Sequence, residues 1–303
     1  MNDIQFPNLG VYLENVPDGI TIFGLEIKFY GIIIACAFML AYYIATKEAK
    51  RTGQNPDDYL DLLLVLIIPA ILGARLYYVL FSSNEFFREG QSVGEMIKNV
   101  FNLRSGGLAI YGGVIAGAIA VIIFAKVKKL SVMQILDTMV MSLLVGQILG
   151  RWGNFFNREA FGGYSDGLFA MAIPVSYYEE NGSLLYLMNK GVITTDMIEN
   201  VKVFQGAEFI QVHPTFLYES MWNLLVLLII FFYRKNKKFE GELTLMYLWG
   251  YGLGRVWIEG LRSDSLLIGG MKASQMLAAA CVVAASCAIA YKRLQLKKKV
   301  GNS

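Results

Sequence analysis

The stretch GGLAIYGGVIAGAIAVIIFA, at residues 106–125, decides the fold class because it contains no charged residue. About 20 mostly apolar residues in a helix are enough to cross the ~30 Å hydrocarbon layer of a membrane. Residues 273–291 form a second run without charge. A core helix of a large globular protein would have to stay uncharged over the same length, so the two runs favour a membrane protein over a soluble one.

Apolar runs of this length recur along the chain. Of its 303 residues, 55% are hydrophobic and 13% are aromatic, a high share for a soluble domain. The runs lie near residues 27–47, 59–83, 107–126, 132–152, 214–233, 242–261 and 273–291. The sequence therefore predicts an all-α polytopic membrane protein in which residues 1–303 form a single transmembrane domain with seven transmembrane helices.

Positive charges indicate the orientation, because they follow every second run. The fifteen cations are Lys47, Lys50, Arg51, Lys126, Lys128, Lys129, Arg234, Lys235, Lys237, Lys238, Lys292, Arg293, Lys297, Lys298 and Lys299. Short loops rich in lysine and arginine stay in the cytoplasm, which places the N-terminus outside and the C-terminus inside. The basic tail then reads as an inner-leaflet anchor, and we expect no nucleic-acid partner. The N-terminus lacks the features of a signal peptide, so the first run should remain as a helix.

The segment 153–212, between the fourth and fifth runs, is predicted to form a small external cap of mixed structure. It holds seven acids and three bases. Within it, the pair Asn181-Gly182 stands between apolar stretches and predicts the turn of a hairpin. Residues 93–103 have apolar side chains at helical spacing, which suits a helix along the outer membrane interface or an ordinary amphipathic loop helix.

Four charged residues stand out within the predicted spans: Arg75, Arg151, Arg255 and Glu259. A charge near the middle of a bilayer costs at least ~2.5–3.5 kcal/mol on insertion scales, so each one needs a partner or a function. Arg255 and Glu259 are four residues apart on one helix face and can form a structural ion pair. Several unpaired arginines at one depth, toward the outer side, favour an anionic ligand instead. The anion available at that depth is the phosphate of a lipid headgroup.

Metal and cofactor chemistry finds little support. The three cysteines, Cys36, Cys281 and Cys287, lie within predicted spans without metal-ligand or redox spacing, and we interpret them as packing residues. The chain also has no phosphate-cradling GxxxxGK[ST] loop and no His/Cys cluster. We therefore expect no metal and no organic cofactor.

The motif GRWGNFFNREAFG at residues 150–162 resembles the signature of the prolipoprotein diacylglyceryl transferase family. Further segments agree with that family in order and spacing. They are Tyr30-Gly31, Tyr111-Gly112-Gly113, His213-Pro214 with Tyr218-Glu219, and the stretch from Tyr251 through Arg255 and Glu259 to Arg262. The resemblance thus extends over nearly the whole chain.

The resemblance implies a reaction and its location. The diacylglyceryl group of phosphatidylglycerol would pass to the thiol of a lipobox cysteine in the signal peptide of a preprolipoprotein, forming a thioether and releasing glycerol phosphate. This is the first step of lipoprotein maturation. It would take place in the bacterial cytoplasmic membrane, with the active site toward the outer leaflet.

The resemblance also implies roles for particular residues. The catalytic candidates are Arg151, Arg255, Tyr111 and Tyr30, and the substrate-binding candidates are Arg151, Asn154, Glu159, Gly162, Tyr251, Glu259 and His213. Arg151 and Arg255 would grip the phosphate, because a guanidinium can hold two oxygens at once. The family often carries a histidine, a candidate base, where this chain has Tyr111. Tyr111 and His213 are therefore rival candidates for the proton acceptor.

Two other classes of protein could use the same arginines. An anionic-lipid transporter or flippase would move lipid without chemistry, although the chain shows no clear repeat pair or broken-helix signal. A membrane receptor or scaffold would tolerate the loss of Arg151 with little more than altered stability.

Overall fold

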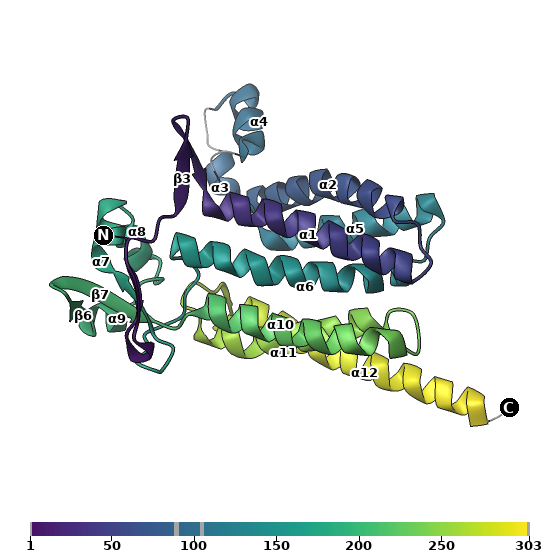
Figure 1. Cartoon of the computed structure of the whole chain (residues 1–303). Helices are drawn as coiled ribbons and strands as arrows, with labels where there is room; N and C mark the ends of the chain where they lie inside the picture. The colour runs from purple at the N-terminus through teal and green to yellow at the C-terminus, as the bar shows by residue number, and fades with distance from the viewer. Residues whose placement is uncertain (1, 88–90, 104–105, 302–303) are drawn as a thin grey trace. The chain divides into compact units, whose positions relative to one another are not determined.

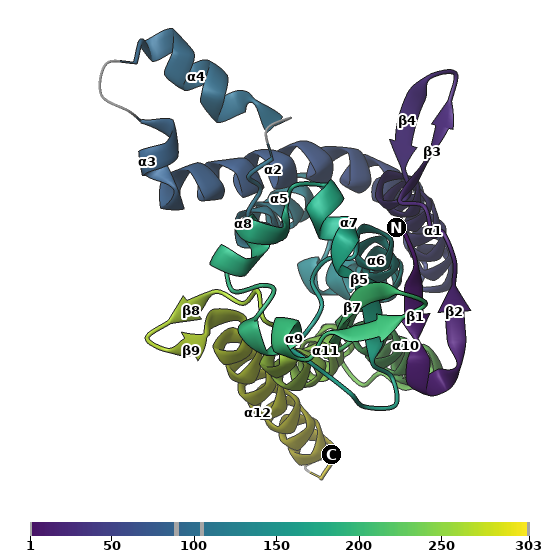
Figure 2. The same cartoon turned by 90° about the vertical axis from the view of Figure 1, so that its left-hand side faces the viewer.

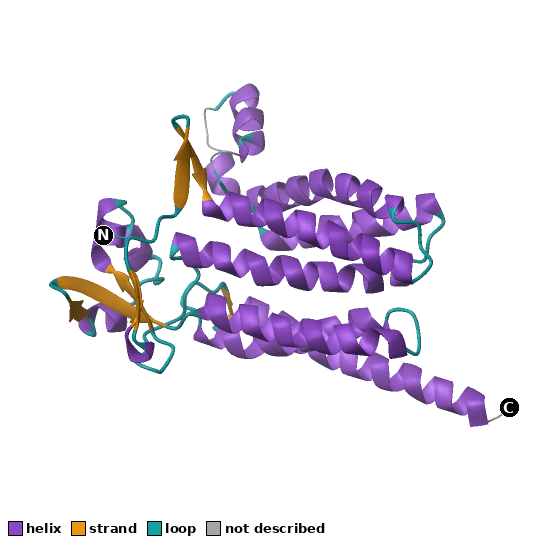
Figure 3. Cartoon of the chain, in the orientation of Figure 1, coloured by secondary structure: helices purple, strands orange, loops and turns teal. Residues whose placement is uncertain are grey.

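The computed structural model describes residues 2–87, 91–103 and 106–301, and helices make up most of it (Figure 1, Figure 3). The chain divides into two compact units. The larger unit consists of Met1–Ala41 together with Val140–Ser303, and the smaller unit is Tyr42–Met139. Helices α1 and α6 each contain residues of both units.

Among the described residues, six helices are long and apolar enough to cross a membrane. They are α1 (Phe29–Arg51), α2 (Asp57–Phe81), α5 (Ile110–Lys128), α6 (Val132–Asn157), α10 (Thr215–Tyr233) and α12 (Ala273–Gly301). A further long helix, α11 (Glu242–Leu261), has 20 residues. Its glycines, tyrosines and charged side chains lower its hydropathy, so it is not among the six. The helices suit a multi-pass membrane protein.

In the smaller unit, α2 packs closely against α5. Gly73 of α2 and Gly112 of α5 face each other so closely that a side chain on either would meet the backbone of the other helix. The core at the other end of this unit consists of Ala45, Ala49, Tyr59, Leu62, Val121, Phe124, Ala125 and Ile135. Small residues at a helix–helix contact are common in membranes because they let the two backbones approach.

Arg75, in α2, has a structural role in this unit. Its guanidinium is buried and donates hydrogen bonds to the carbonyl oxygens of Asn99, Val100, Asn102, Gly106 and Gly107, at 2.5–3.1 Å. These carbonyls belong to α4 and to the segment that leads into α5. Arg75 is therefore not an unpaired cation, and its partners are backbone carbonyl groups rather than an anionic ligand.

Two short helices follow α2 in the smaller unit. They are α3 (Ser83–Phe86) and α4 (Val93–Phe101). The predicted amphipathic helix is confirmed in α4, which begins with a capping box. The Ser92 side chain accepts a hydrogen bond from the backbone N–H of Glu95, and the Glu95 side chain accepts one from the backbone N–H of Ser92.

The larger unit contains a five-stranded antiparallel sheet of order β2-β1-β5-β7-β6 (Figure 2). Its strands are β1 (Ile4–Phe6), β2 (Val11–Leu13), β5 (Met171–Pro174), β6 (Lys202–Phe204) and β7 (Ala207–Val212). Gln5 of β1 pairs with Ala172 of β5, so the N-terminal segment belongs to the same sheet as part of segment 153–212. The core between the strands and the neighbouring helices includes Ile4, Phe161, Ile173, Met197 and Ile210.

The segment 153–212 also carries three short helices, α7 (Val175–Glu180), α8 (Leu184–Asn189) and α9 (Thr195–Glu199). Asn181 and Gly182 connect α7 to α8, so the predicted β-hairpin at this pair was wrong. Asn181 ends α7 and Gly182 follows with a φ of +65°. A glycine of positive φ commonly follows the end of a helix, which explains why an Asn-Gly pair can end α7 instead of forming a hairpin turn.

Arg158 ties the end of α6 to the N-terminal segment. Its buried guanidinium donates hydrogen bonds to the carbonyl oxygens of Asn2 and Val16, each at 2.6 Å, and to that of Phe156 at 2.9 Å. The guanidinium also lies 4.4 Å from the ring centroid of Tyr177. These contacts fix the direction in which the chain leaves α6, within the motif at 150–162.

Candidate active site

Glu219, on α10, connects arginines from different parts of the larger unit. Its Oε2 lies 2.6 Å from Nη2 of Arg151 on α6, and its Oε1 lies 3.1 Å from Nη1 of Arg255 on α11. The same Oε1 lies 3.7 Å from Nη1 of Arg262. Because a single carboxylate faces all three guanidinium groups, it sets their relative positions.

The carboxylate and the guanidinium groups of this cluster differ in exposure. The Glu219 side chain is 4% exposed, whereas those of Arg151 and Arg255 are 21% and 17% exposed. The acid is therefore buried behind arginines that still reach the surface. Such an arrangement leaves guanidinium N–H groups available to an anion that approaches from outside the cluster.

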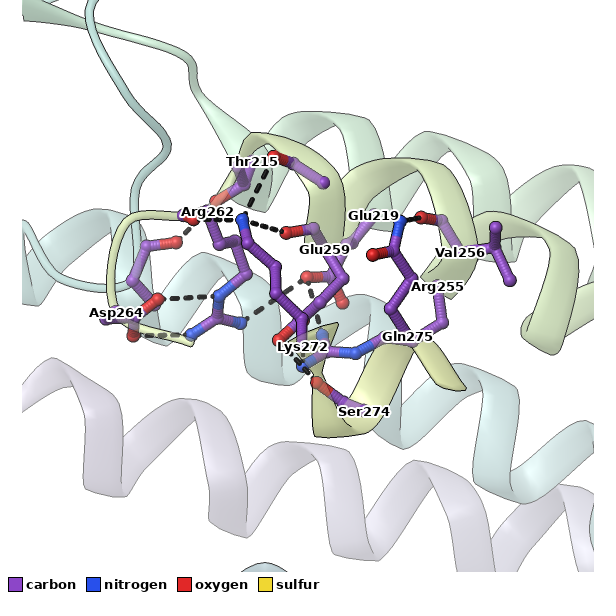
Figure 4. Close-up of polar contacts among 12 residues, drawn as sticks. Thr215, Glu219, Arg255, Val256, Glu259, Arg262, Asp264, Lys272, Ser274 and Gln275 are labelled. Atoms are coloured by element: carbon purple, nitrogen blue, oxygen red, sulfur yellow. Dashed lines mark hydrogen bonds and ion pairs between the residues drawn. The ribbon is translucent and has the colours of Figure 1, made fainter. Parts of the chain in front are cut away.

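The predicted pairing of Arg255 with Glu259 is confirmed. Nη2 of Arg255 lies 2.6 Å from Oε2 of Glu259, one turn further along α11. The other carboxylate oxygen of Glu259 accepts a hydrogen bond from the Ser274 hydroxyl. Figure 4 shows Glu219, Arg255, Glu259, Arg262 and Ser274 gathered at this end of α11. Arg255 is thus held between two carboxylates, which fixes the orientation of its guanidinium plane.

Arg262 follows α11 and pairs with Asp264 through two hydrogen bonds, of 2.8 Å and 2.7 Å. Burial alone would raise the pKa of the Asp264 carboxyl, but the hydrogen bonds from Arg262 outweigh it and lower that pKa. Lys272 completes the end of the helix by donating to the carbonyl oxygens of Glu259, Gly260 and Arg262, at 2.8, 3.0 and 2.6 Å. The three acids Glu219, Glu259 and Asp264 balance the charge of the three arginines.

This balance corrects one expectation from the sequence. The expected anionic ligand depends on arginines without partners in the spans, whereas Arg151 and Arg255 both have carboxylate partners. An anion would therefore bind through directed N–H donors rather than through excess positive charge.

A second chain of contacts runs within the motif at 150–162, from Arg151 to Glu159. Nη1 of Arg151 donates to Oδ1 of Asn154 at 3.3 Å, and Nδ2 of Asn154 donates to Oε1 of Glu159 at 3.0 Å. Asn157 donates to the same oxygen of Glu159 at 3.2 Å. The structure thus brings together three of the predicted residues, with Asn154 between the arginine and the acid.

Gly162 and His213 lie side by side because their backbone segments run antiparallel there. The N–H of Gly162 donates to the carbonyl oxygen of His213 at 2.9 Å. A Cβ at Gly162 would stand 2.7 Å from the Leu261 carbonyl oxygen and 2.8 Å from the His213 Cβ, so only glycine fits. The contacts give Gly162 a packing role.

His213 is half-buried just before α10. Burial lowers the pKa of its imidazole, which favours the neutral form that can accept a proton. Its Nδ1 lies 3.4 Å from the hydroxyl of Tyr218.

The predicted tyrosines have different surroundings. In the larger unit, the Tyr30 ring packs against Gly153, where a Cβ would lie 2.5 Å from ring atom Cδ2. Tyr251 stacks on Tyr247, with ring centroids 5.6 Å apart. Tyr111 belongs to the smaller unit, in the first turn of α5, where its ring centroid lies 6.4 Å from that of Tyr77.

The sequence analysis named Glu219 and Arg262 in segments that resemble the family but gave neither a role in the site, and it did not name Asp264. A signal for Glu219 was present, because it is an acid within the apolar run 214–233 and so meets the criterion that selected Glu259. Arg262 and Asp264 lie just outside the predicted spans, where charges are ordinary. Among the residues that the structure describes, no group of three or more His, Cys, Asp and Glu side chains could hold a metal ion.

Comparison with known proteins relates the chain to a family. A family model described as prolipoprotein diacylglyceryl transferase matches residues 17–291. A relative from Clostridioides difficile is 36% identical over 283 residues, which cover 93% of this chain and 96% of that protein. A relative from Synechococcus elongatus is 38% identical over 259 residues, covering 84% of this chain and 79% of that protein. One from Oceanobacillus iheyensis is 38% identical over 276 residues, covering 91% and 87%.

All three relatives are named phosphatidylglycerol–prolipoprotein diacylglyceryl transferase. The matched region contains Arg151, Glu219, Arg255, Glu259 and Arg262. The chain therefore belongs to the prolipoprotein diacylglyceryl transferase family.

Proposed function

We propose that this chain transfers the diacylglyceryl group of phosphatidylglycerol to the cysteine thiol of a lipobox in a preprolipoprotein signal peptide. The family and the names of the relatives support the two substrates. The structural observation that carries the proposal is the shared Glu219, which holds Arg151 and Arg255 next to each other with both guanidinium groups partly exposed.

The reaction forms a carbon–sulfur bond and breaks a carbon–oxygen bond. The thiol loses its proton to a base, and the sulfur attacks the glyceryl carbon that carries the phosphate. The bonding electrons leave with the phosphate oxygen as glycerol phosphate. Negative charge grows on that oxygen, and the donors of Arg151 and Arg255 stabilise it. Asn154, Glu159, Glu259 and Tyr251 orient the arginines or the headgroup, and Tyr30 lines the entrance.

A direct test is to incubate the purified protein with phosphatidylglycerol vesicles and a lipobox peptide. We expect the diacylglyceryl mass to appear on the cysteine, and no product on a peptide with serine at that position. A transporter or flippase would move labelled phosphatidylglycerol across vesicles without forming the thioether. If labelled lipid moves and no thioether forms, the protein is a transporter and the proposed transferase function is wrong.

We further propose that α11 joins the six apolar helices as a seventh span. Arg255 and Glu259 lower the hydropathy of α11, but they form ion pairs within the protein. A paired charge inside a helix bundle is tolerated in a membrane where a lone charge is not. The basic clusters place the C-terminus in the cytoplasm and the N-terminus outside. The active site and the cap of 153–212 then face the outer side of the bacterial cytoplasmic membrane.

Cysteine labelling in intact cells tests this orientation. In a background in which Cys36, Cys281 and Cys287 are replaced, we expect Asn181→Cys to react with a membrane-impermeant maleimide. Lys235→Cys, in the loop that also holds Lys237, should react only after the cells are opened. The reason is the excess of lysine and arginine in that loop. Labelling of both positions from the same side would rule out the seven-span arrangement.

Tyr111 and His213 remain the two candidates for the base, and pH–rate profiles separate them. Tyr111 takes the position at which the family often carries a histidine. If its hydroxyl takes part in proton transfer or binds the headgroup, Tyr111→Phe should cut activity strongly. Tyr111→His should then keep a good part of the activity with a changed pH profile, because imidazole titrates near 6.5.

The profile has a different form if His213 is the base. Burial lowers the pKa of His213 below its ordinary value of 6.5. The neutral imidazole then persists to lower pH, so the acid limb of the profile should lie below about pH 6.5 and should disappear in His213→Gln. Full activity of Tyr111→Phe with collapse of His213→Gln would assign the base role to His213.

A further inference from the structure

The segment between the five-stranded sheet and α1 forms a separate hairpin. Strands β3 (Gly19–Ile22) and β4 (Leu25–Lys28) pair with each other, and in the described residues neither belongs to a larger sheet. Ile22 pairs with Leu25, which leaves Phe23 and Gly24 as a two-residue turn. Figure 2 shows the hairpin projecting away from strands β1 and β2.

The hairpin has one apolar and one polar face. Residues paired across antiparallel strands place their side chains on the same face. Ile20 pairs with Ile27, and Ile22 with Leu25, so one face is entirely aliphatic. Thr21 pairs with Glu26 on the other face. The side chains of Ile20, Ile22 and Leu25 are nevertheless exposed in the structure.

Phe23, at the tip, is unusual in both conformation and exposure. Its φ is +50° and that of Gly24 is +78°. Two-residue hairpin turns of positive φ favour asparagine or glycine at the first position, because a bulky side chain is strained there. The Phe23 side chain is also fully exposed. The turn itself therefore gives no reason for an aromatic residue at this position.

The chain places this hairpin directly beside a candidate membrane span. Strand β4 ends at Lys28 and α1 begins at Phe29, with no linker between them. At the base of the hairpin, Lys28 pairs with Asp18 at 2.8 Å and with Glu26 at 2.5 Å. Charges thus gather where the span begins, while the aliphatic face and the tip carry none.

We propose that the β3–β4 hairpin is an anchor on the membrane surface. Phe23 and the aliphatic face insert among the lipid headgroups and the upper acyl chains of the leaflet in which α1 begins. The polar face, with Thr21 and Glu26, stays toward water. The inference rests on the proposed membrane span of α1, and it does not depend on the transferase reaction. The anchor would hold the chain between β2 and α1 at a fixed depth.

Spin labels on the full-length protein test this inference. In the background that lacks Cys36, Cys281 and Cys287, Phe23→Cys and Glu26→Cys are each labelled with a nitroxide. The proteins are then placed in phosphatidylglycerol and phosphatidylethanolamine vesicles. We expect the label at position 23 to collide mainly with oxygen, which dissolves in the membrane. The label at position 26 should collide mainly with a water-soluble nickel chelate. Equal access of the chelate to both labels would overturn the inference.

A second copy of the chain could also cover the hairpin, and the same sample distinguishes the two cases. Strong spin–spin broadening between labels at position 23 would show a contact between copies and would overturn the membrane assignment. The variant Phe23→Asn then tests the tip. Asparagine suits the turn, so the hairpin should form, but a label at Leu25→Cys should become several-fold more accessible to the chelate. If the chelate reaches the label at position 25 equally well with and without Phe23→Asn, Phe23 does not contribute to the anchor.

Discussion

Arg151→Lys and Arg255→Lys are each expected to lower transferase turnover by roughly 10²–10³-fold, the scale measured when one fixed donor to a developing oxyanion is lost. Lysine keeps the positive charge, but it cannot contact a carboxylate and a phosphate with separate nitrogens of one planar group. In Arg255, Nη1 already faces Glu219 and Nη2 faces Glu259. A lysine at position 255 has one nitrogen, so it would lose its contact with Glu219 or with Glu259 when it binds the substrate phosphate. Turnover of each purified variant with phosphatidylglycerol and a lipobox peptide measures the effect.

Arg293→Lys is the matched control for these variants. Arg293, on α12, pairs with Glu242 at 2.7 Å at the opposite end of α11 from the cluster. The substitution also replaces a guanidinium that contacts a carboxylate through two nitrogens, Nε and Nη2, in the same unit of the protein. We expect a lower unfolding temperature in detergent and a normal rate per folded molecule. Near-normal turnover in Arg151→Lys or Arg255→Lys would mean that the arginine is structural.

Periodicity and spacing could predict contacts within a helix. The pair Arg255–Glu259 and the contact of Arg151 with Asn154 both follow from residues three or four apart on one helix. Contacts between helices could not be predicted in this way, because a hydrophobic pattern does not say which faces meet. The role of Glu219 as the shared partner of Arg151 and Arg255 therefore appears only in the structure.

The membrane helices and the mixed segment differ in how far the sequence predicted them. Helices of span length follow from hydropathy. The predicted run 242–261 coincides with α11 (Glu242–Leu261), although residues of the site interrupt its apolar pattern. The sheet was not predicted, because its strands β1 and β5 are far apart in sequence. Gln5 pairs with Ala172 there, and no local pattern in either strand indicates its partner. Local signals such as Asn181-Gly182 indicate a turn but not the elements that it connects.

Glu219→Gln is expected to reduce turnover by roughly 10²-fold, although glutamine has nearly the same size and shape as glutamate. The carboxylate faces three guanidinium groups, and its loss leaves the cluster of three arginines with two acids. The arginines would then repel one another and move apart. A displacement of about 1 Å at a reacting centre is enough to cost 10²-fold in rate. Glu219 contacts the arginines, so we regard it as a positioning residue.

Glu219→Asp separates this role from simple packing. Aspartate keeps the charge but is shorter, so it should hold part of the cluster and retain more activity than glutamine. If Glu219 only fills space, the order reverses, because glutamine fills the site and aspartate leaves a cavity. The readout is kcat and KM for phosphatidylglycerol in both variants. A positioning role predicts that kcat falls more than KM changes, since the geometry matters most when charge develops on the leaving group.

Glu242→Gln provides the control, because Glu242 is also a buried glutamate of the larger unit that pairs with an arginine. Its carboxylate accepts hydrogen bonds from Arg293 and from the Tyr233 hydroxyl, at the start of α11. Both glutamates are buried, so the loss of either carboxylate leaves its arginine partner without a counter-charge, and both glutamine variants should unfold at lower temperature. Only Glu219→Gln should lose turnover per folded molecule. If the two variants lose stability equally and both keep normal kcat, Glu219 is a structural ion-pair residue and the arginines hold their positions without it.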